Sequence, residues 1–143
     1  MSTWSTGASS HARRYQNRQG GTAWSSIVVD GGYSLEAVWG ASASDVWAVG
    51  YDENDLTGLT LHWNGVAWSK IPSGTTQRLR SVRGSGADDV WAVGMGGAII
   101  HWDGGAWALV ESGTGSTLTA VWTSATNVTW AVGDFATILR RIP

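Results

Sequence analysis

Short apolar runs recur along the chain and are separated by turns that contain glycine. The tetrapeptide W-A-V-G begins at Trp47, Trp91 and Trp130, and further apolar runs lie before and after each copy. Runs of about four to six residues that are rich in Val, Ile and Trp are typical of β-strands and are too short for an ordinary helix. The pattern therefore predicts an all-β chain.

The strand-like runs belong to three tandem copies of one unit. Successive W-A-V-G motifs are 44 and 39 residues apart, and the longer interval contains an insertion within residues 51–58. Each copy reads as four short strands, and the fourth begins at Trp68 or Trp107 in the first two copies. A four-stranded unit repeated every ~40–50 residues is typical of a β-propeller blade. The predicted blades span about residues 35–71, 79–111 and 118–142.

The third copy stops after its third strand, and a matching fourth strand stands near the front of the chain. The segment TAWSSIVV (22–29) resembles the W-S-K-I and W-A-L-V strands of the first two copies. We therefore expect residues 22–143 to form a three-blade unit in which strand 22–29 closes the last blade, because this arrangement removes an exposed sheet edge. Residues 1–21 are expected to form a partly disordered arm, in which 12–16 mimics a third strand.

Three blades are too few to close a ring, because propellers typically have about four to eight. A lone chain would expose two tryptophan-bearing blade faces, and apolar patches of that size mark interfaces. We therefore predict a homodimer that closes a six-bladed ring, in which each chain lends residues 22–29 to the other. A trimer of nine blades fits less well, and a self-assembling fragment of a longer repeat propeller is the alternative.

Composition narrows the possible partners and leaves the compartment open. Charged residues make up 14% of the chain and the formal net charge is −2, so there is no electrostatic footprint for nucleic acid. The chain has no cysteine, and it has no apolar run of the roughly 18 residues that span a membrane. Its first 20 residues contain no hydrophobic segment of the signal-peptide type. We expect a soluble protein without a membrane span.

Polar residues mostly follow the repeat, which argues against catalysis. His62, His101 and Arg140 share one repeat position, and successive blades would keep them apart, so we expect structural side chains rather than metal ligands. Acidic and amide residues before the second strand suit turns. These are Asp45, Asp88, Asp89 and Asn127. The insertion is expected to be a solvated loop rather than a calcium site. No acid–base pair or nucleophile triad stands out, so we expect a non-enzymatic protein with no catalytic residue, metal or cofactor.

The repeat carries a family resemblance. The pattern L-x-x-V-x-G-x-S-x-x-D-V-W-A-V-G-x-x-G-x-I-x-H-W-D-G-x-x-W resembles bacterial Trp-rich β-propeller repeats, and its W-A-V-G core is similar to that of photosystem II stability-factor-like propellers. The W-N-G-x-x-W turn at 63–68 and the W-D-G-x-x-W turn at 102–107 resemble the turn of small fucose-binding propeller lectins. The resemblance covers about residues 22–143. It implies a propeller fold, and the lectin-like turn implies ligand sites between blades.

Tryptophan supplies the candidate ligand contacts, because its ring stacks on the apolar face of a sugar while a nearby arginine donates to hydroxyl groups. The last position of the first strand varies in chemistry from copy to copy, and the two lectin-like turns are flanked by tryptophans. The predicted ligand-binding set is Trp39, Arg83, Trp122, Trp63, Trp68, Trp102 and Trp107. Core packing is the alternative role for each tryptophan. The sequence favours a multivalent carbohydrate-binding module, and the alternative is a protein-interaction scaffold with no small ligand.

Overall fold

The computed structural model describes residues 10–13 and 23–143, and within these ranges the chain is almost entirely β-structure. The strands are β1 (Ser10–Arg13), β2 (Ser26–Val29), β3 (Tyr33–Ser42), β4 (Asp45–Asp52), β5 (Thr57–Trp63), β6 (Trp68–Pro72), β7 (Leu79–Gly86), β8 (Asp89–Gly94), β9 (Ile99–Trp102), β10 (Trp107–Leu109), β11 (Leu118–Thr123), β12 (Thr129–Gly133) and β13 (Thr137–Arg141). The helical element in this part of the chain is a single 3-10 turn, η1 (Met95–Gly97), and nothing there is a helix that could cross a membrane.

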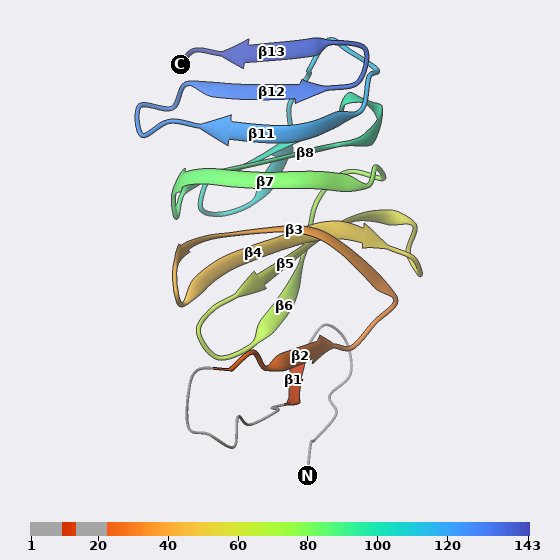
Figure 1. Cartoon of the computed structure of the whole chain (residues 1–143), viewed down its shortest axis with the longest axis vertical. Helices are drawn as coiled ribbons and strands as arrows, with labels where there is room; N and C mark the ends of the chain where they lie inside the picture. The colour runs from red at the N-terminus through yellow and green to blue at the C-terminus, as the bar shows by residue number, and fades with distance from the viewer. Residues whose placement is uncertain (1–9, 14–22) are drawn as a thin grey trace.

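Strands β3 to β13 form three antiparallel sheets that follow one another along the chain, and β1 and β2 form a separate two-stranded sheet. Blade 1 has the order β3-β4-β5-β6, blade 2 has β7-β8-β9-β10, and blade 3 has the three strands β11-β12-β13. The first strands of the blades, β3, β7 and β11, lie side by side and bring the three sheets into one row (Figure 1). This arrangement is a partial β-propeller, and it confirms the fold class predicted from the repeat.

Strand pairing gives each residue an equivalent in the other blades. Trp39 lies opposite Trp47 in blade 1, and the corresponding pairs are Arg83 with Trp91 and Trp122 with Trp130. Each first strand also contains a bulge directly after its first leucine. The bulge residues, which stand outside the ladder, are Glu36, Arg80 and Thr119.

The glycine of the W-A-V-G motif is required by a close approach of two backbones. A Cβ atom on Gly50 would lie 1.9 Å from the carbonyl oxygen of Ser34, on the segment that pairs with it. A Cβ atom on Gly94 would lie 2.0 Å from the carbonyl oxygen of Arg78, and one on Gly133 would lie 1.9 Å from that of Thr117. Any side chain at these positions would force the first two strands of a blade apart, which explains why glycine recurs in all three copies.

The N-terminal strands form a hairpin at the blade 1 end of the row (Figure 1). Within the single chain β2 pairs with β1, whereas we predicted that residues 22–29 would pair with the last blade of another chain. Val29 packs against the apolar core of blade 1. Most of the predicted 1–21 arm lies outside the described residues, and its 10–13 segment is the strand β1.

Candidate functional site

The contact between blades 1 and 2 is a buried layer of aromatic and aliphatic side chains. Trp47 and Val49 project from β4 toward blade 2, where they meet Leu79, Val82 and other buried residues. The Trp47 ring centroid lies 4.7 Å from that of Trp102 and 5.0 Å from that of Trp107, in tilted and edge-on orientations. Such contacts between rings add to the stabilisation that comes from burying their surface.

The contact between blades 2 and 3 repeats this design. Trp91 and Val93 take the places of Trp47 and Val49 and pack against Leu118, Val121 and other residues of blade 3. Each blade therefore has two distinct faces. The forward face carries the tryptophan and the last valine of V-W-A-V or T-W-A-V, and the rear face carries the leucine and valine of L-x-x-V.

The rear face of blade 1 exposes two first-strand positions that are buried core positions in the next two blades. Ala48 and Leu61 of the same face are buried, in a cluster with Val29, Tyr33 and Trp68. Leu35 is 54% exposed and Val38 is 67% exposed. The equivalent residues that form the blade contacts are Leu79 (0%), Val82 (6%), Leu118 (0%) and Val121 (9%). The same residue types thus belong to a core in two blades and to the surface in the first.

The forward face of blade 3 is open in the same way. Trp130 is 36% exposed and Val132 is 40% exposed, whereas Trp47 and Val49 are 1% and 0% exposed. Ile138, on β13 beside Val132, is also exposed. At one end of the described row, the forward face of blade 3 therefore meets no following blade. At the other end, the rear face of blade 1 meets no preceding blade.

At the variable position of the first strand, the size of the residue changes together with that of the corresponding residue in the next blade. The Trp39 ring lies so close to Gly84 that a Cβ atom there would come within 2.6 Å of it. At the next contact Arg83 replaces the tryptophan and Thr123 replaces the glycine. At the open end Trp122 is again a tryptophan, and the glycine at the matching position of blade 1 is Gly40. Trp39, Arg83 and Trp122 thus lie one to a blade, and the partly buried Trp39 packs between blades.

The repeated basic position of the third strand covers the core tryptophan of its own blade. The His62 ring lies 4.5 Å from the Trp47 ring, and the His101 ring lies 4.2 Å from the Trp91 ring. In blade 3 the Arg140 guanidinium lies 5.5 Å from the centre of the Trp130 ring. These contacts are in line with the structural role that the repeat predicted.

The two histidines are held by acidic residues that begin the second strand. His62 and His101 each place Nε2 2.7 Å from a carboxylate oxygen, of Asp45 and Asp89 respectively. Partial burial works against the charged form of Asp89, but hydrogen bonds from Ser85 and His101 outweigh it, so the pKa of Asp89 lies below its ordinary value. The repetition of this pair in two blades indicates a scaffold contact.

The two lectin-like turns are closed by their own polar side chains. Asn64 Oδ1 accepts hydrogen bonds from the backbone amides of Val66 and Ala67, and Asp103 Oδ1 accepts them from Gly105 and Ala106. The hydrogen bonds from these two amides lower the pKa of Asp103, and the bond from Gly105 has the larger effect.

Each of these turns brings together the two tryptophans that flank it. The ring centroids are 5.7 Å apart in both Trp63–Trp68 and Trp102–Trp107. The second pair lies in the contact with blade 1, where Trp107 is only 8% exposed. A ligand would therefore reach little of the Trp107 ring in this arrangement, and the sugar-stacking role of these residues stays a prediction.

The insertion is more ordered than the solvated loop we predicted. Tyr51 and Asp52 continue β4, and Asp52 is buried. Asp52 Oδ1 accepts hydrogen bonds from the amides of Asn54 and Asp55, and Lys70 Nζ lies 2.6 Å from Asp52 Oδ2 and 2.8 Å from Asp55 Oδ2. Burial opposes ionisation of Asp52, but Lys70 and the two amides together lower its pKa. Lys70 thus forms ion pairs with two of the three carboxylates of the insertion.

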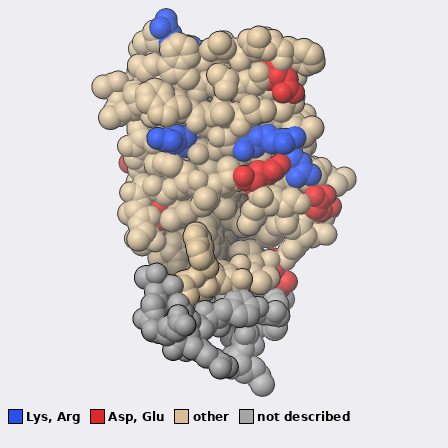
Figure 2. All heavy atoms as spheres, viewed as in Figure 1, with Lys and Arg blue, Asp and Glu red and all other residues tan. Residues whose placement is uncertain are grey.

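The sequence analysis missed a cluster of charged side chains on and beside the first strands of blades 1 and 2. The Arg78 guanidinium lies 3.9 Å from Glu36 Oε1 and 3.4 Å from Glu53 Oε1. The Arg80 guanidinium lies 3.8 Å from Glu36 Oε1. Figure 2 shows basic and acidic side chains gathered on this face of the molecule. The bulge positions Glu36, Arg80 and Thr119 differ in charge from blade to blade. Their variation within an otherwise regular repeat was the signal that could have identified them.

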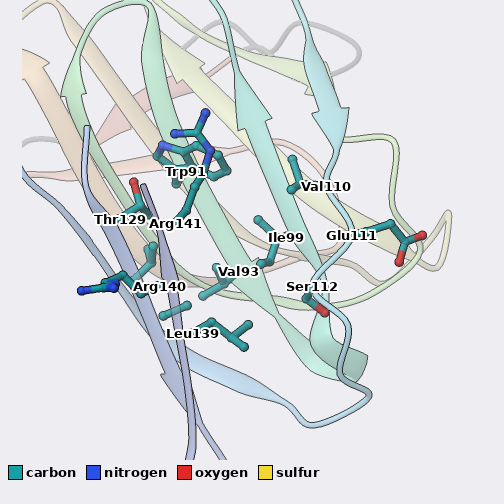
Figure 3. A pocket seen from close by; sticks show the side chains of 12 residues that line it. Trp91, Val93, Ile99, Val110, Glu111, Ser112, Thr129, Leu139, Arg140 and Arg141 are labelled. Carbon is teal, nitrogen blue, oxygen red and sulfur yellow. The ribbon is translucent and has the colours of Figure 1, made fainter. Parts of the chain in front are cut away.

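A cavity of about 320 Å³ lies between blades 2 and 3. Figure 3 shows Trp91, Ile99 and Val110 on the blade 2 side and Leu139 and Arg141 from β13 on the other. The Arg141 guanidinium lies 5.1 Å from the centre of the Trp91 ring. The walls are thus mainly apolar, with arginine side chains on one side.

Comparisons with known proteins identify the fold class. No family model and no curated protein matches the chain. Among solved structures it is similar to a β-propeller described as YCF48 bound to D1 peptide, with a TM-score of 0.63 and 16% sequence identity. The match covers 78% of this chain and 38% of that chain, so this chain spans well under half of the neighbour's length. At this identity the likeness shows the fold alone, which is that of a partial β-propeller.

Proposed function

We propose that the chain is a non-enzymatic protein-interaction scaffold that becomes a complete propeller when two copies meet. The rear face of blade 1 carries the proposal, because it exposes the leucine and valine that its equivalents in blades 2 and 3 bury. Exposed apolar surface of this kind indicates an interface. A second copy offers the forward face of blade 3, which has the same residue types as the forward faces inside the chain.

Two copies that meet in this way form a ring with two identical junctions. The forward face of blade 3 in one copy meets the rear face of blade 1 in the other, and a half-turn generates the second contact. The junction would repeat the contact between blades 1 and 2, with Trp122 lying over Gly40 as Trp39 lies over Gly84. Six blades fall within the range of closed propellers, which is typically about four to eight.

The face formed by the first strands is the proposed binding surface for a protein partner. Its bulge positions supply a carboxylate, a guanidinium and a hydroxyl from three neighbouring blades. Charged and hydrogen-bonding groups on a rigid frame suit the backbone and side chains of a peptide, and arginine is enriched among residues that dominate interfaces. The similar propeller is described as bound to a peptide, which is in line with this ligand class.

A phage-displayed library of random linear peptides tests the binding function. We expect enriched peptides whose affinity falls at least about tenfold with Arg80→Glu, a change of roughly 1.4 kcal/mol. The control variant is Val66→Ala on the exposed turn between β5 and β6, and it should bind as the wild type does. Failure to enrich any peptide, together with binding to an immobilised glycan array, would instead support the carbohydrate-binding function.

A further inference from the structure

Blade 3 lacks the fourth strand that blades 1 and 2 possess. Its sheet ends at β13, and among the described residues no strand pairs with the free edge of β13. In blade 2 the fourth strand begins at Trp107, whose ring fills the contact with Trp47 of the preceding blade. The equivalent space beside Trp91 is the cavity between blades 2 and 3 (Figure 3).

The N-terminal hairpin contains a strand that is built as a fourth strand. Eleven residues separate Trp68 from Leu79 and Trp107 from Leu118, and the same interval separates Trp24 from Leu35. With Trp24 aligned to Trp68, Ser26 corresponds to Lys70, which lies opposite Leu61 in blade 1. Ser26 lies opposite Arg13, so β1 holds β2 in the register that a third strand would adopt.

Trp24 has no place in the core of its own chain. It is 96% exposed, whereas its equivalent Trp107 is 8% exposed. Trp24 is thus an exposed aromatic side chain beside a strand, and the cavity between blades 2 and 3 is lined by Trp91, which is 3% exposed and lies beneath Arg141. Strands β1 and β2 lie at the blade 1 end of the row and β13 lies at the other end (Figure 1), so β2 does not reach β13 of its own chain in this arrangement.

We infer that β2 of one copy pairs with β13 of a second copy as the fourth strand of blade 3 and inserts Trp24 into the cavity against Trp91. The inference rests on the two-chain ring proposed above. Strand equivalence fixes the register, with Ser26 opposite Leu139 and Ile27 opposite Ile138. Arg141 then takes the role of Trp102, and Trp24 takes the role of Trp107.

The exchange replaces one hairpin partner with another. β1 overlaps the 12–16 segment that resembles a third strand, whereas β13 is the third strand of blade 3 and is held by five residue pairs with β12 and by a short turn from Asp134. β1 therefore yields its place on β2 to the partner's β13. Four backbone pairs are exchanged for an equivalent set, so the gain comes from burying Trp24 and closing the edge of blade 3, as in domain swapping.

Engineered cysteines test the register directly, because the chain contains no cysteine of its own. The full-length variant Ser26→Cys with Leu139→Cys should form a disulfide-linked two-chain species on mild oxidation, because residues directly opposite each other in a sheet satisfy disulfide geometry. The control variant combines Val28→Cys with Leu139→Cys, two residues out of register, and should cross-link poorly. Equal cross-linking of the two variants would overturn the proposed register.

Trp24→Ala tests the inserted side chain. We expect the dissociation constant of the two-chain species to rise at least about 30-fold, because a central aromatic anchor dominates such contacts. Val66→Ala, which removes another exposed side chain, should leave the constant unchanged. A wild-type chain that stays monomeric would contradict the ring itself. If the wild-type chain is a dimer and Trp24→Ala leaves its dissociation constant unchanged, strand donation is wrong while the ring proposal stands.

Discussion

Replacing Val38 with aspartate is expected to abolish the two-chain ring while leaving the single chain folded. Val38 is 67% exposed in one chain, so the substitution should change the free energy of unfolding by less than about 0.5 kcal/mol. In the ring it would take the buried place that Val82 has between blades 1 and 2, where an unpaired carboxylate is strongly disfavoured. We expect the dissociation constant to rise by at least about 100-fold, or ~3 kcal/mol.

Sedimentation velocity over a dilution series measures this change, and thermal unfolding monitored by circular dichroism checks the fold. Val66→Asp is the matched control, because it places the same charge on a turn where Val66 is 83% exposed and where the counterpart Gly105 stays exposed beside the contact between blades 1 and 2. Val82→Asp is the opposite control and should unfold the chain, since Val82 is buried in the blade contact. Undiminished association of Val38→Asp would show that the rear face of blade 1 takes no part in the interface.

Trp47→Ala should destabilise the chain by about 3–5 kcal/mol, because it leaves a large cavity between blades 1 and 2. Total stabilities of single domains are roughly 5–15 kcal/mol, so the variant should be close to unfolding at ordinary temperatures. Trp130→Ala removes the equivalent side chain from blade 3. Its cost in the single chain should be about 1 kcal/mol, because the Trp130 ring contacts no following blade and remains partly exposed.

Chemical denaturation in the Val38→Asp background separates these effects from association. There, the loss of unfolding free energy should be several times larger for Trp47→Ala than for Trp130→Ala. In the wild-type background Trp130→Ala should also weaken the two-chain species, since the ring would bury Trp130 as Trp47 is buried. If both variants lose the same unfolding free energy in the Val38→Asp background, the Trp130 side of blade 3 is not an open face that differs from the contact between blades 1 and 2.

The blade structure could be predicted from the sequence because the repeat and the strand period agree. The V-W-A-V runs, the glycines after them and the tryptophan-flanked turns each have a local physical cause, such as the backbone approach at Gly50. The three copies then multiply the signal. The forward and rear faces were harder to predict, because the face that a residue joins depends on the bulge in the first strand, which shifts the alternation after Leu35.

The roles of particular tryptophans could not be read from the sequence alone. Trp24, Trp68 and Trp107 occupy one repeat position, yet their surroundings run from solvent to core because the neighbouring blade differs for each. Likewise, the sequence predicts that 22–29 is a fourth strand, but it does not indicate that β2 pairs with β1 within the single chain. Both features depend on which blade stands beside the segment, and the order of residues does not specify that.

The mass of the wild-type chain under native electrospray conditions at micromolar concentration tests the central claim most directly. Two open blade faces that match each other should give a species with the mass of two chains. On dilution this species should dissociate to single chains, and no larger species should be present. A spectrum that contains only single chains at that concentration would mean that Leu35, Val38 and Trp130 remain in water. The self-completing propeller would then be wrong.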